Sequence, residues 1–377
     1  MRIFFLLIIA AFLGMSFYTG LRGWQALPRR RWLRVAWAAG FGGLTLSMFL
    51  GFFLRRSGVA DTAFFRWMQH AGAGWRFAII YWFCLALFFD ALRLADRRFR
   101  IFPAWVKRHP GRARVAALVF SIVAVPAIFA GGYWHFINPA TTRVTIDIAK
   151  PAGRLRVLRA VVASDMHLGE TIGRKRLADY VRRINALGPD IILLPGDQVD
   201  SHLAPLIREN MGGELKKLRA PLGVYAVLGN HERYAGADAC TAWMEAQGIR
   251  VLRDRAVKIA DAFYLVGRED DRRRKSMAGL LAPLDRSLPV IVLDHQPRDL
   301  GEPAAAGVDL QLSGHTHGGQ IWPVTWVVPW MYEFHYGHGR KGGYQIYVTS
   351  GLGLWGFPAR IGSKSELVDL TVNFGVK

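Results

Sequence analysis

The chain has 377 residues, of which 52% are hydrophobic, and a formal net charge of +21. That hydrophobic share is high for a wholly soluble protein, and the length allows one large domain or two smaller ones. The charge is uneven: residues 1–140 hold 18 Lys and Arg against 3 acids, whereas the other 237 residues hold 31 against 25. A basic excess beside apolar stretches is typical of loops that flank membrane helices and argues against nucleic acid as a partner. The 2 cysteines exclude a disulfide framework and a cysteine zinc cluster.

Long apolar segments fill the amino-terminal third of the chain. Most reach or approach the ~20 residues that cross a bilayer core, and tryptophans stand near their ends, as at membrane interfaces. A signal peptide is the alternative for the first segment, but no small-residue cleavage site precedes a soluble stretch. We therefore predict an all-α transmembrane region of about four helices over residues 1–137. The segments are Ile3–Tyr18, Val35–Leu54, Phe77–Leu94 and Val115–Tyr133.

The charges of the connections predict an orientation. Arginines crowd the first connection (22–34), and arginines and a lysine crowd the third (93–114), while the second has only Arg55, Arg56, Arg66 and Arg76 over a longer stretch. Because cytoplasmic loops carry the excess of Lys and Arg, the first and third connections are expected inside. Everything after Tyr133 then lies outside, which in a bacterial inner membrane is the periplasm.

Residues 138–154 are expected to form a linker, and residues 155–377 an α/β domain with layered sheets. In this domain, apolar runs of strand length alternate with helical patterns at Lys175–Leu187, Pro205–Leu218 and Ala237–Gln247. The predicted strands are Arg156–Ala163, Ile191–Leu194, Val224–Leu228, Ile249–Arg253, Phe263–Val266, Val290–Leu293, Leu310–Leu312, Tyr344–Thr349 and Leu367–Val372.

Polar clusters follow several of these strands, at the end where open α/β sheets gather their ligands. Their carboxylate, imidazole and amide groups suit a borderline or hard divalent cation. Two such residues at i and i+2 of an extended segment point the same way, and the neighbouring glycines allow sharp turns. One such cluster alone would be an ordinary turn, but the ordered series predicts a metal site. The clusters are Asp165-Met166-His167, Gly196-Asp197-Gln198-Val199-Asp200, Gly229-Asn230-His231-Glu232, Asp294-His295 and Gly314-His315-Thr316-His317.

This ordered set resembles the calcineurin-like metallophosphoesterase superfamily over residues 156–372. The resemblance implies an αββα sandwich with a binuclear centre of Mn, Fe or Zn, in which a metal-activated water attacks phosphorus. It implies that His231 protonates the leaving oxygen or stabilises the transition state, and Asp200 and Glu232 are expected to orient an imidazole. The implied ligands are Asp165, His167, Asp197 and His317 for one metal, and Asp197, Asn230, His295 and His315 for the other.

The tail narrows the resemblance to the bacterial membrane-associated branch, which includes phosphodiesterases and some lipid pyrophosphatases. Gly314–Gln320, Ser350–Gly353, Gly356–Gly362 and Ser365–Leu367 carry it. Arg360 is a candidate contact for substrate phosphate. The aromatic stretch Ile321–Tyr336 either meets the lipid interface or packs on the domain.

The sequence therefore predicts a membrane-anchored phosphoesterase acting on a phosphodiester, phosphomonoester or pyrophosphate bond. The expected partners are the bilayer and a phosphorylated lipid or small molecule. The alternative is a transporter-like or sensor protein with a regulatory metal domain. Ionisable residues within membrane spans usually mark a transport path, and Asp90 is the one acid within the predicted apolar spans and lies near a span end, so the sequence disfavours this alternative. A nuclease would require a basic groove that the modest charge of the carboxy-terminal domain disfavours.

Overall fold

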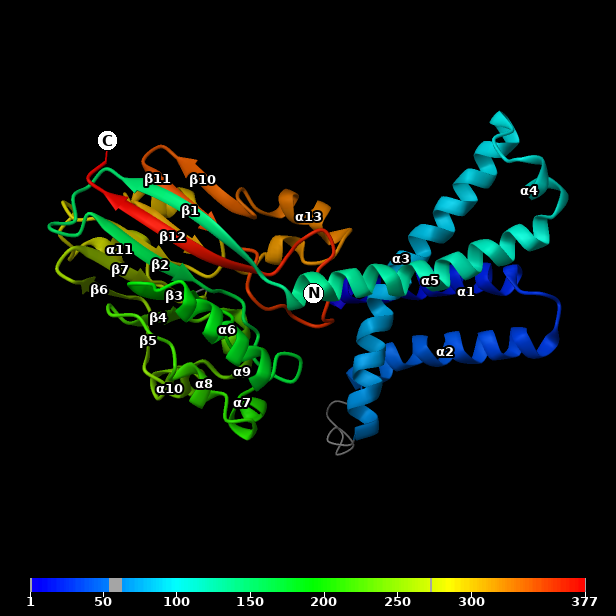
Figure 1. Ribbon diagram of the computed structural model, residues 1–377, viewed down its shortest axis with the longest axis horizontal. Helices are drawn as coiled ribbons and strands as arrows, with labels where there is room; N and C mark the ends of the chain where they lie inside the picture. The colour runs from blue at the N-terminus through cyan, green and yellow to red at the C-terminus, as the bar shows by residue number, and fades with distance from the viewer. Residues whose placement is uncertain (1, 54–62, 272, 377) are drawn as a thin grey trace. The chain divides into compact units, whose positions relative to one another are not determined.

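The computed structural model describes residues 2–53, 63–271 and 273–376. The chain divides into two compact units, Met1–Ala130 and Gly131–Lys377 (Figure 1). The last turns of the fifth helix, residues 131–137, belong to the second unit. We call the second unit the carboxy-terminal unit.

The first unit is helical. Its helices are α1 (Arg2–Ala26), α2 (Arg31–Phe53), α3 (Ala63–Phe99), α4 (Ala104–Arg108) and α5 (Pro110–Ile137). The described residues include 4 stretches long and apolar enough to cross a membrane: Leu6–Ala26, Arg31–Leu50, Ala71–Phe99 and Pro110–Ile137. This agrees with the number of predicted spans. The predicted second connection at Arg55 and Arg56, and Leu54 before it, lie outside the described residues.

Asp90, which the sequence places near the end of an apolar span, has partners. Asp90 of α3 forms an ion pair with Arg22 of α1 and accepts a hydrogen bond from Tyr18. Ionisable groups in membrane helices often mark transport paths. Here the carboxylate is engaged in holding α1 to α3, so Asp90 gives no support to a transporter.

Two mixed sheets form the carboxy-terminal unit. The first has the order β1-β12-β2-β3-β4-β5 and the second β10-β11-β9-β8-β7-β6. The first comprises β1 (Ala140–Ile148), β2 (Val157–Val162), β3 (Ile191–Pro195), β4 (Val224–Val227), β5 (Ile249–Val251) and β12 (Glu366–Phe374). The second comprises β6 (Arg255–Ile259), β7 (Phe263–Gly267), β8 (Val290–Leu293), β9 (Leu310–Ser313), β10 (Gly337–Lys341) and β11 (Tyr344–Val348).

Buried apolar side chains define four layers. A central cluster lies between the sheets, with Leu193 from one and Leu265 and Ile291 from the other. The first sheet's outer face is covered by α6 (Arg174–Ala186), α7 (Ala204–Arg208), α8 (Gly212–Leu215), α9 (Asn230–Ala235) and α10 (Ala237–Glu245). The second sheet's outer face carries α11 (Met277–Leu281) and α12 (Gly301–Ala305). This arrangement confirms the αββα sandwich.

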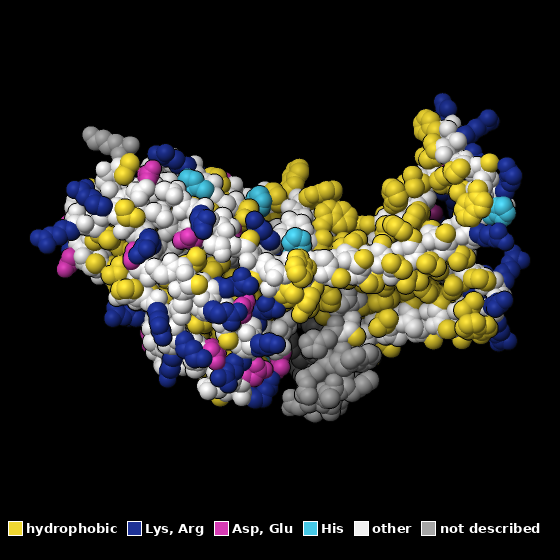
Figure 2. Space-filling model, in the orientation of Figure 1, with side chains coloured by type: hydrophobic (Ala, Val, Ile, Leu, Met, Phe, Trp, Pro, Cys, Tyr) yellow, Lys and Arg dark blue, Asp and Glu magenta, His cyan; other side chains and the backbone are white. Residues whose placement is uncertain are grey.

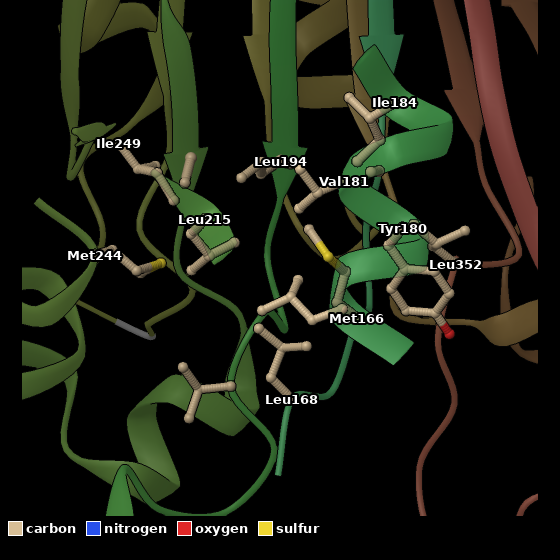
Figure 3. Close-up of a cluster of buried hydrophobic side chains, with 14 of the residues drawn as sticks. Met166, Leu168, Tyr180, Val181, Ile184, Leu194, Leu215, Met244, Ile249 and Leu352 are labelled. Atoms are coloured by element: carbon tan, nitrogen blue, oxygen red, sulfur yellow. The ribbon is translucent and has the colours of Figure 1, made fainter. Parts of the chain in front are cut away.

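Helix α6 shows how the sequence builds one of these layers. Leu177, Tyr180, Val181 and Ile184 are all buried and recur at the i, i+3, i+4, i+7 spacing of one helix face. Figure 3 shows Tyr180, Val181 and Ile184 in one cluster with side chains of β3 and of the segments that lead to the site. The same core therefore supports both the helix layer and the loops that follow the strands.

The predicted linker is wrong for residues 140–148. They form β1, which pairs in parallel with β12 from Ala140↔Glu366 to Ile148↔Phe374. Its apolar residues alternate with polar ones, and Ile146 and Ile148 enter the core between the sheets. The predicted helix Pro205–Leu218 is also interrupted, because Asn210 adopts a left-handed backbone (φ 51°) between α7 and α8.

The parallel strands of both sheets bring their carboxyl ends to one edge of the sandwich. β2, β3 and β4 are parallel neighbours in the first sheet, as are β8 and β9 in the second. Every predicted polar cluster follows one of these strands. The topology thus gathers segments that are far apart in the sequence.

Glu366 joins strands beside this edge. Its carboxylate is fully buried and accepts hydrogen bonds from side chains of β1 and β11, from the residue before β10 and from the residues after β11. The donors are the hydroxyls of Thr142 (2.7 Å), Tyr336 (2.9 Å), Tyr347 (3.1 Å) and Thr349 (2.7 Å) and the amide of Ser350 (3.1 Å).

We expect Glu366→Ala to lower the free energy of unfolding by about 3 kcal/mol or more, because it leaves several buried donors unpaired. Thermal unfolding of the full chain in detergent measures the loss. Glu333→Ala is the control, since Glu333 forms a surface pair with Lys341 and such pairs contribute ~0–1 kcal/mol. Equal unfolding midpoints for the two variants would contradict this role of Glu366.

Candidate metal centre

Asp165 and Asp197 lie at the centre of the site and are almost completely buried. Asp165 Oδ1 lies 3.3 Å from His317 Nε2, and Asp197 Oδ2 lies 3.2 Å from His295 Nε2. Among the described residues, both carboxylates form ion pairs with histidines and with no lysine or arginine. Burial raises the pKa of the Asp165 carboxyl. Buried carboxylates without a lysine or arginine are costly unless a cation compensates them.

Six of the predicted ligands form two groups of three, and within each group the ligand atoms lie within 4.8 Å of one another. One holds Asp165, His167 and His317, and the other holds Asp197, His295 and His315. Asn230 begins α9; its buried Oδ1 has no hydrogen-bond partner among the described residues, and neither has His295 Nε2. The structure therefore brings six of the seven predicted ligands together in these two groups.

Hydrogen bonds orient the imidazoles toward the site. His295 Nδ1 lies 2.8 Å from the carbonyl of Pro195, which can only accept, so Nδ1 carries the proton and Nε2 faces Asp197. His167 Nδ1 lies 3.2 Å from Asp200 Oδ1, while its Nε2 lies 3.1 Å from His317 Nε2. Two imidazole nitrogens that face each other next to carboxylates suit a divalent cation. The residues present thus fit the metals that the family resemblance implies.

The backbone at these ligands is strained. Asp165 (φ 55°), His167 (φ 46°), Asp197 (φ 55°), His315 (φ 70°) and His317 (φ 52°) all adopt left-handed conformations. Each costs of the order of 1 kcal/mol or more for a non-glycine residue, and such strain clusters at functional sites. We predicted that the residues at i and i+2 converge because they lie on an extended segment. That reason is wrong, since the backbone at these positions is left-handed and not extended.

Two glycines permit the carboxylates to approach the next loop. A Cβ on Gly229 would stand 2.1 Å from Asp197 Oδ1, and one on Gly314 would stand 2.1 Å from Asp165 Oδ2. Both distances are far below a van der Waals contact, so a side chain at either position would displace the carboxylate. Gly196 is the one of the three predicted turn glycines with a left-handed backbone (φ 89°).

Asp200 has the orienting role that the sequence predicted. Its Oδ1 lies 3.2 Å from His167 Nδ1 and 3.3 Å from His231 Nδ1. The Asp200 carbonyl lies 2.6 Å from the same His231 nitrogen, which fixes the proton on Nδ1. Burial lowers the pKa of His231, but the Asp200 hydrogen bonds and the Asp197 charge raise it to about 9. His231 thus carries a proton on Nδ1 and lies beside the predicted ligand His167.

Glu232 does not orient an imidazole, contrary to prediction. Its carboxylate is fully buried and accepts from the backbone amides of Asp197 (3.0 Å), Val199 (2.7 Å) and Gly229 (2.7 Å). These bonds tie the loop after β3 to the start of α9. The signal in the sequence is a glutamate at the third position of a short helix, which can reach back to cap the helix start.

Arg360 does not point at a substrate site, which corrects its prediction as a contact for substrate phosphate. Its side chain is fully buried. The guanidinium donates to the carbonyls of His317 (3.1 Å) and Gly351 (3.0 Å) and to that of Gly353. Arg360 therefore supports the backbone beneath a predicted ligand.

We expect Glu232→Gln to weaken divalent-cation binding about 10- to 100-fold, as losses in the supporting hydrogen bonds of metal ligands do. The new amide group would meet backbone donors, so the two loops would separate. Calorimetric titration of the full chain with Mn²⁺ measures the change. Glu245→Gln is the matched control, because Glu245 is a surface residue beside Arg255; equal affinities for the two variants would refute this role.

Comparison with known proteins agrees with this geometry. The sequence model of calcineurin-like phosphoesterases matches residues 158–319, a range that holds every predicted ligand. An uncharacterized metallophosphoesterase of Aquifex aeolicus is 33% identical over 65% of this chain and 97% of its own length. An uncharacterized metallophosphoesterase of Bacillus subtilis is 30% identical over 67% and 94%.

A zebrafish relative is named for membrane helices as well as for a phosphoesterase domain. This Danio rerio protein, called a transmembrane protein with metallophosphoesterase domain, is 31% identical over 70% of this chain. The match spans 63% of the zebrafish protein. The chain belongs to the calcineurin-like metallophosphoesterase family, as a membrane protein whose phosphoesterase domain follows its apolar helices.

Proposed function

We propose that the protein hydrolyses a phosphodiester, phosphomonoester or pyrophosphate bond in a lipid or cell-envelope substrate. The observation that carries the proposal is the pair of ligand groups around buried Asp165 and Asp197, with His231 at their edge. We assign Asp165, His167, Asp197 and His317 to one divalent cation. Asp197, Asn230, His295 and His315 hold the other, so Asp197 belongs to both sets.

The roles of the side chains follow from their hydrogen bonds. Bound divalent cations supply Lewis acidity and make a water molecule nucleophilic at neutral pH. His231 keeps one proton on Nδ1 through the Asp200 carbonyl and presents Nε2 to the leaving group. As the bond between phosphorus and the leaving oxygen breaks, Nε2 donates a proton to that oxygen. Its ring lies 4.4 Å from the His167 ring, centroid to centroid, which keeps this proton beside the ligand groups.

The loop charges support an external catalytic domain. Arg29 and Arg30 lie between α1 and α2, and Lys107 and Arg108 end α4, so these connections are assigned to the cytoplasm. In a bacterial inner membrane, the phosphoesterase domain is then periplasmic, and phospholipid head groups or envelope phosphates are the accessible substrates.

Alkaline phosphatase fused after the carboxyl terminus should therefore be active. If that fusion is inactive and green fluorescent protein fused at the same position fluoresces, the domain lies in the cytoplasm and the assignment is reversed.

A chromogenic diester with Mn²⁺ tests the activity. Wild-type turnover should require the cation, and Asp197→Asn should abolish turnover. His231→Ala should lose about 10²- to 10⁴-fold with an alkyl leaving group, the usual contribution of general acid catalysis. The loss should be much smaller with nitrophenolate, which leaves without a proton. Equal losses on both substrates, at equal cation content, would exclude His231 as the proton donor.

Arg298 replaces Arg360 as the candidate for holding substrate phosphate. It lines a cavity of about 370 Å³ with Tyr332 and Glu333. Its guanidinium lies 5.9 Å from the centre of the Tyr332 ring, and that ring lies 6.1 Å from the ring of His315. Arg298 and the predicted ligand His315 thus lie against the same tyrosine ring, and a guanidinium placed there can bind an anionic oxygen of the substrate.

We expect Arg298→Ala to raise KM about tenfold with little change in kcat, from the ~1.5 kcal/mol of a hydrogen bond to a charged group. Steady-state kinetics with the diester measures this split. Arg340→Ala is the control, since Arg340 bonds only locally to the Gly342 carbonyl at 2.9 Å. An unchanged KM in Arg298→Ala would exclude the contact.

A further inference from the structure

Helix α13 (Val324–Met331) exposes large apolar side chains beside the metal centre. Trp326 is 68% exposed, Trp330 is 90% exposed and Met331 is 64% exposed. The helix contains no charged residue. In Figure 2, hydrophobic side chains gather over this part of the carboxy-terminal unit. Contiguous exposed aromatic surface is unfavourable in water and usually marks a contact surface.

This helix lies at the edge of the carboxy-terminal unit where α5 ends. The backbone at 360–361 joins the two: Arg360 N donates to Gly132 O at 2.9 Å, and Ile361 N donates to Gln320 O at 2.9 Å. Trp322 N in turn donates to Ile361 O at 2.7 Å. One short segment therefore bonds both to the end of α5 and to the residues that lead into α13.

The end of α5 carries exposed aromatic residues of its own. Tyr133 is 47% exposed and Trp134 is 64% exposed, and Pro110–Ile137 is among the stretches apolar enough to cross a membrane. Tyrosine and tryptophan concentrate where membrane helices leave the hydrocarbon core, because their rings are apolar and their tips polar. The edge that carries α13 is thus the edge at which this apolar, aromatic-tipped stretch ends.

We propose that α13 inserts Trp326, Trp330 and Met331 into the lipid interface and holds the rim of the metal centre against the head groups. The 3-10 helix η2 (His317–Gly319), which begins with a predicted ligand, precedes α13 by a few residues. Insertion therefore presents the site to phosphates of bilayer lipids. This consequence for the substrate rests on the proposed phosphoesterase function, whereas the docking itself does not.

Fluorescence quenching of the full chain in phosphatidylcholine vesicles tests the docking. A polarity-sensitive label is attached at Trp330→Cys, or separately at Trp326→Cys, in a Cys84→Ala, Cys240→Ala background. Ile207→Cys in α7 is the control, since Ile207 is also exposed, at 63%. Doxyl groups on the lipid acyl chains report insertion, and iodide reports exposure to water. Only labelled proteins that unfold at the same temperature as the background are compared.

We expect doxyl lipids to quench labels at 330 and 326 several-fold more than the label at 207, with iodide showing the reverse order. Iodide quenching at 330 and 326 equal to that at 207 would place α13 in water and overturn the proposal. Protection from both quenchers would show that protein covers α13 and would also overturn it. Diester hydrolysis is measured on the same samples, so that failure of docking and failure of the enzymatic function are separate results.

Discussion

The site depends on the burial of two carboxylates, those of Asp165 and Asp197. Among the described residues, these carboxylates form ion pairs with imidazoles and with no lysine or arginine. Such burial is unfavourable without compensating positive charge. The surrounding structure fixes the arrangement nonetheless. Glu232 ties two of the loops together, Arg360 holds the carbonyl of His317, and glycines at 229 and 314 leave room for the carboxylate oxygens. We propose that bound divalent cations compensate the remaining cost of burying these carboxylates.

The strained backbone is part of the same arrangement. Predicted ligands follow parallel strands, yet several have left-handed φ values that an unconstrained chain would rarely adopt. The buried core beneath them, with Met166, Leu168 and Leu352, packs the loops against the helices of the first sheet. A rigid base of this kind holds ligand atoms in place before a cation arrives, which favours tight and selective binding.

Strand-length apolar runs and the polar clusters after them are local patterns, so the residues themselves predicted an α/β domain with a metal site. The αββα sandwich and the assignment of individual ligands came from the family resemblance that these clusters carry. It did not predict β1, whose alternating residues were read as a linker, because its partner β12 lies more than 200 residues away. Arg360 and Glu232 were assigned from their residue types alone. The bond of Glu232 to the Gly229 amide follows a local capping pattern, but its bond to Val199 and those of Arg360 to the His317 and Gly351 carbonyls depend on other loops, which no local pattern encodes.

We propose that two cations share Asp197. Electron paramagnetic resonance of the full chain loaded with Mn²⁺ tests this, because two Mn²⁺ ions joined by a carboxylate are magnetically coupled. We expect a coupled multiline signal in the wild type and its replacement by the signal of isolated ions in His295→Ala, which keeps the ligands of the first group. A signal of isolated Mn²⁺ in the fully loaded wild type would contradict the shared site.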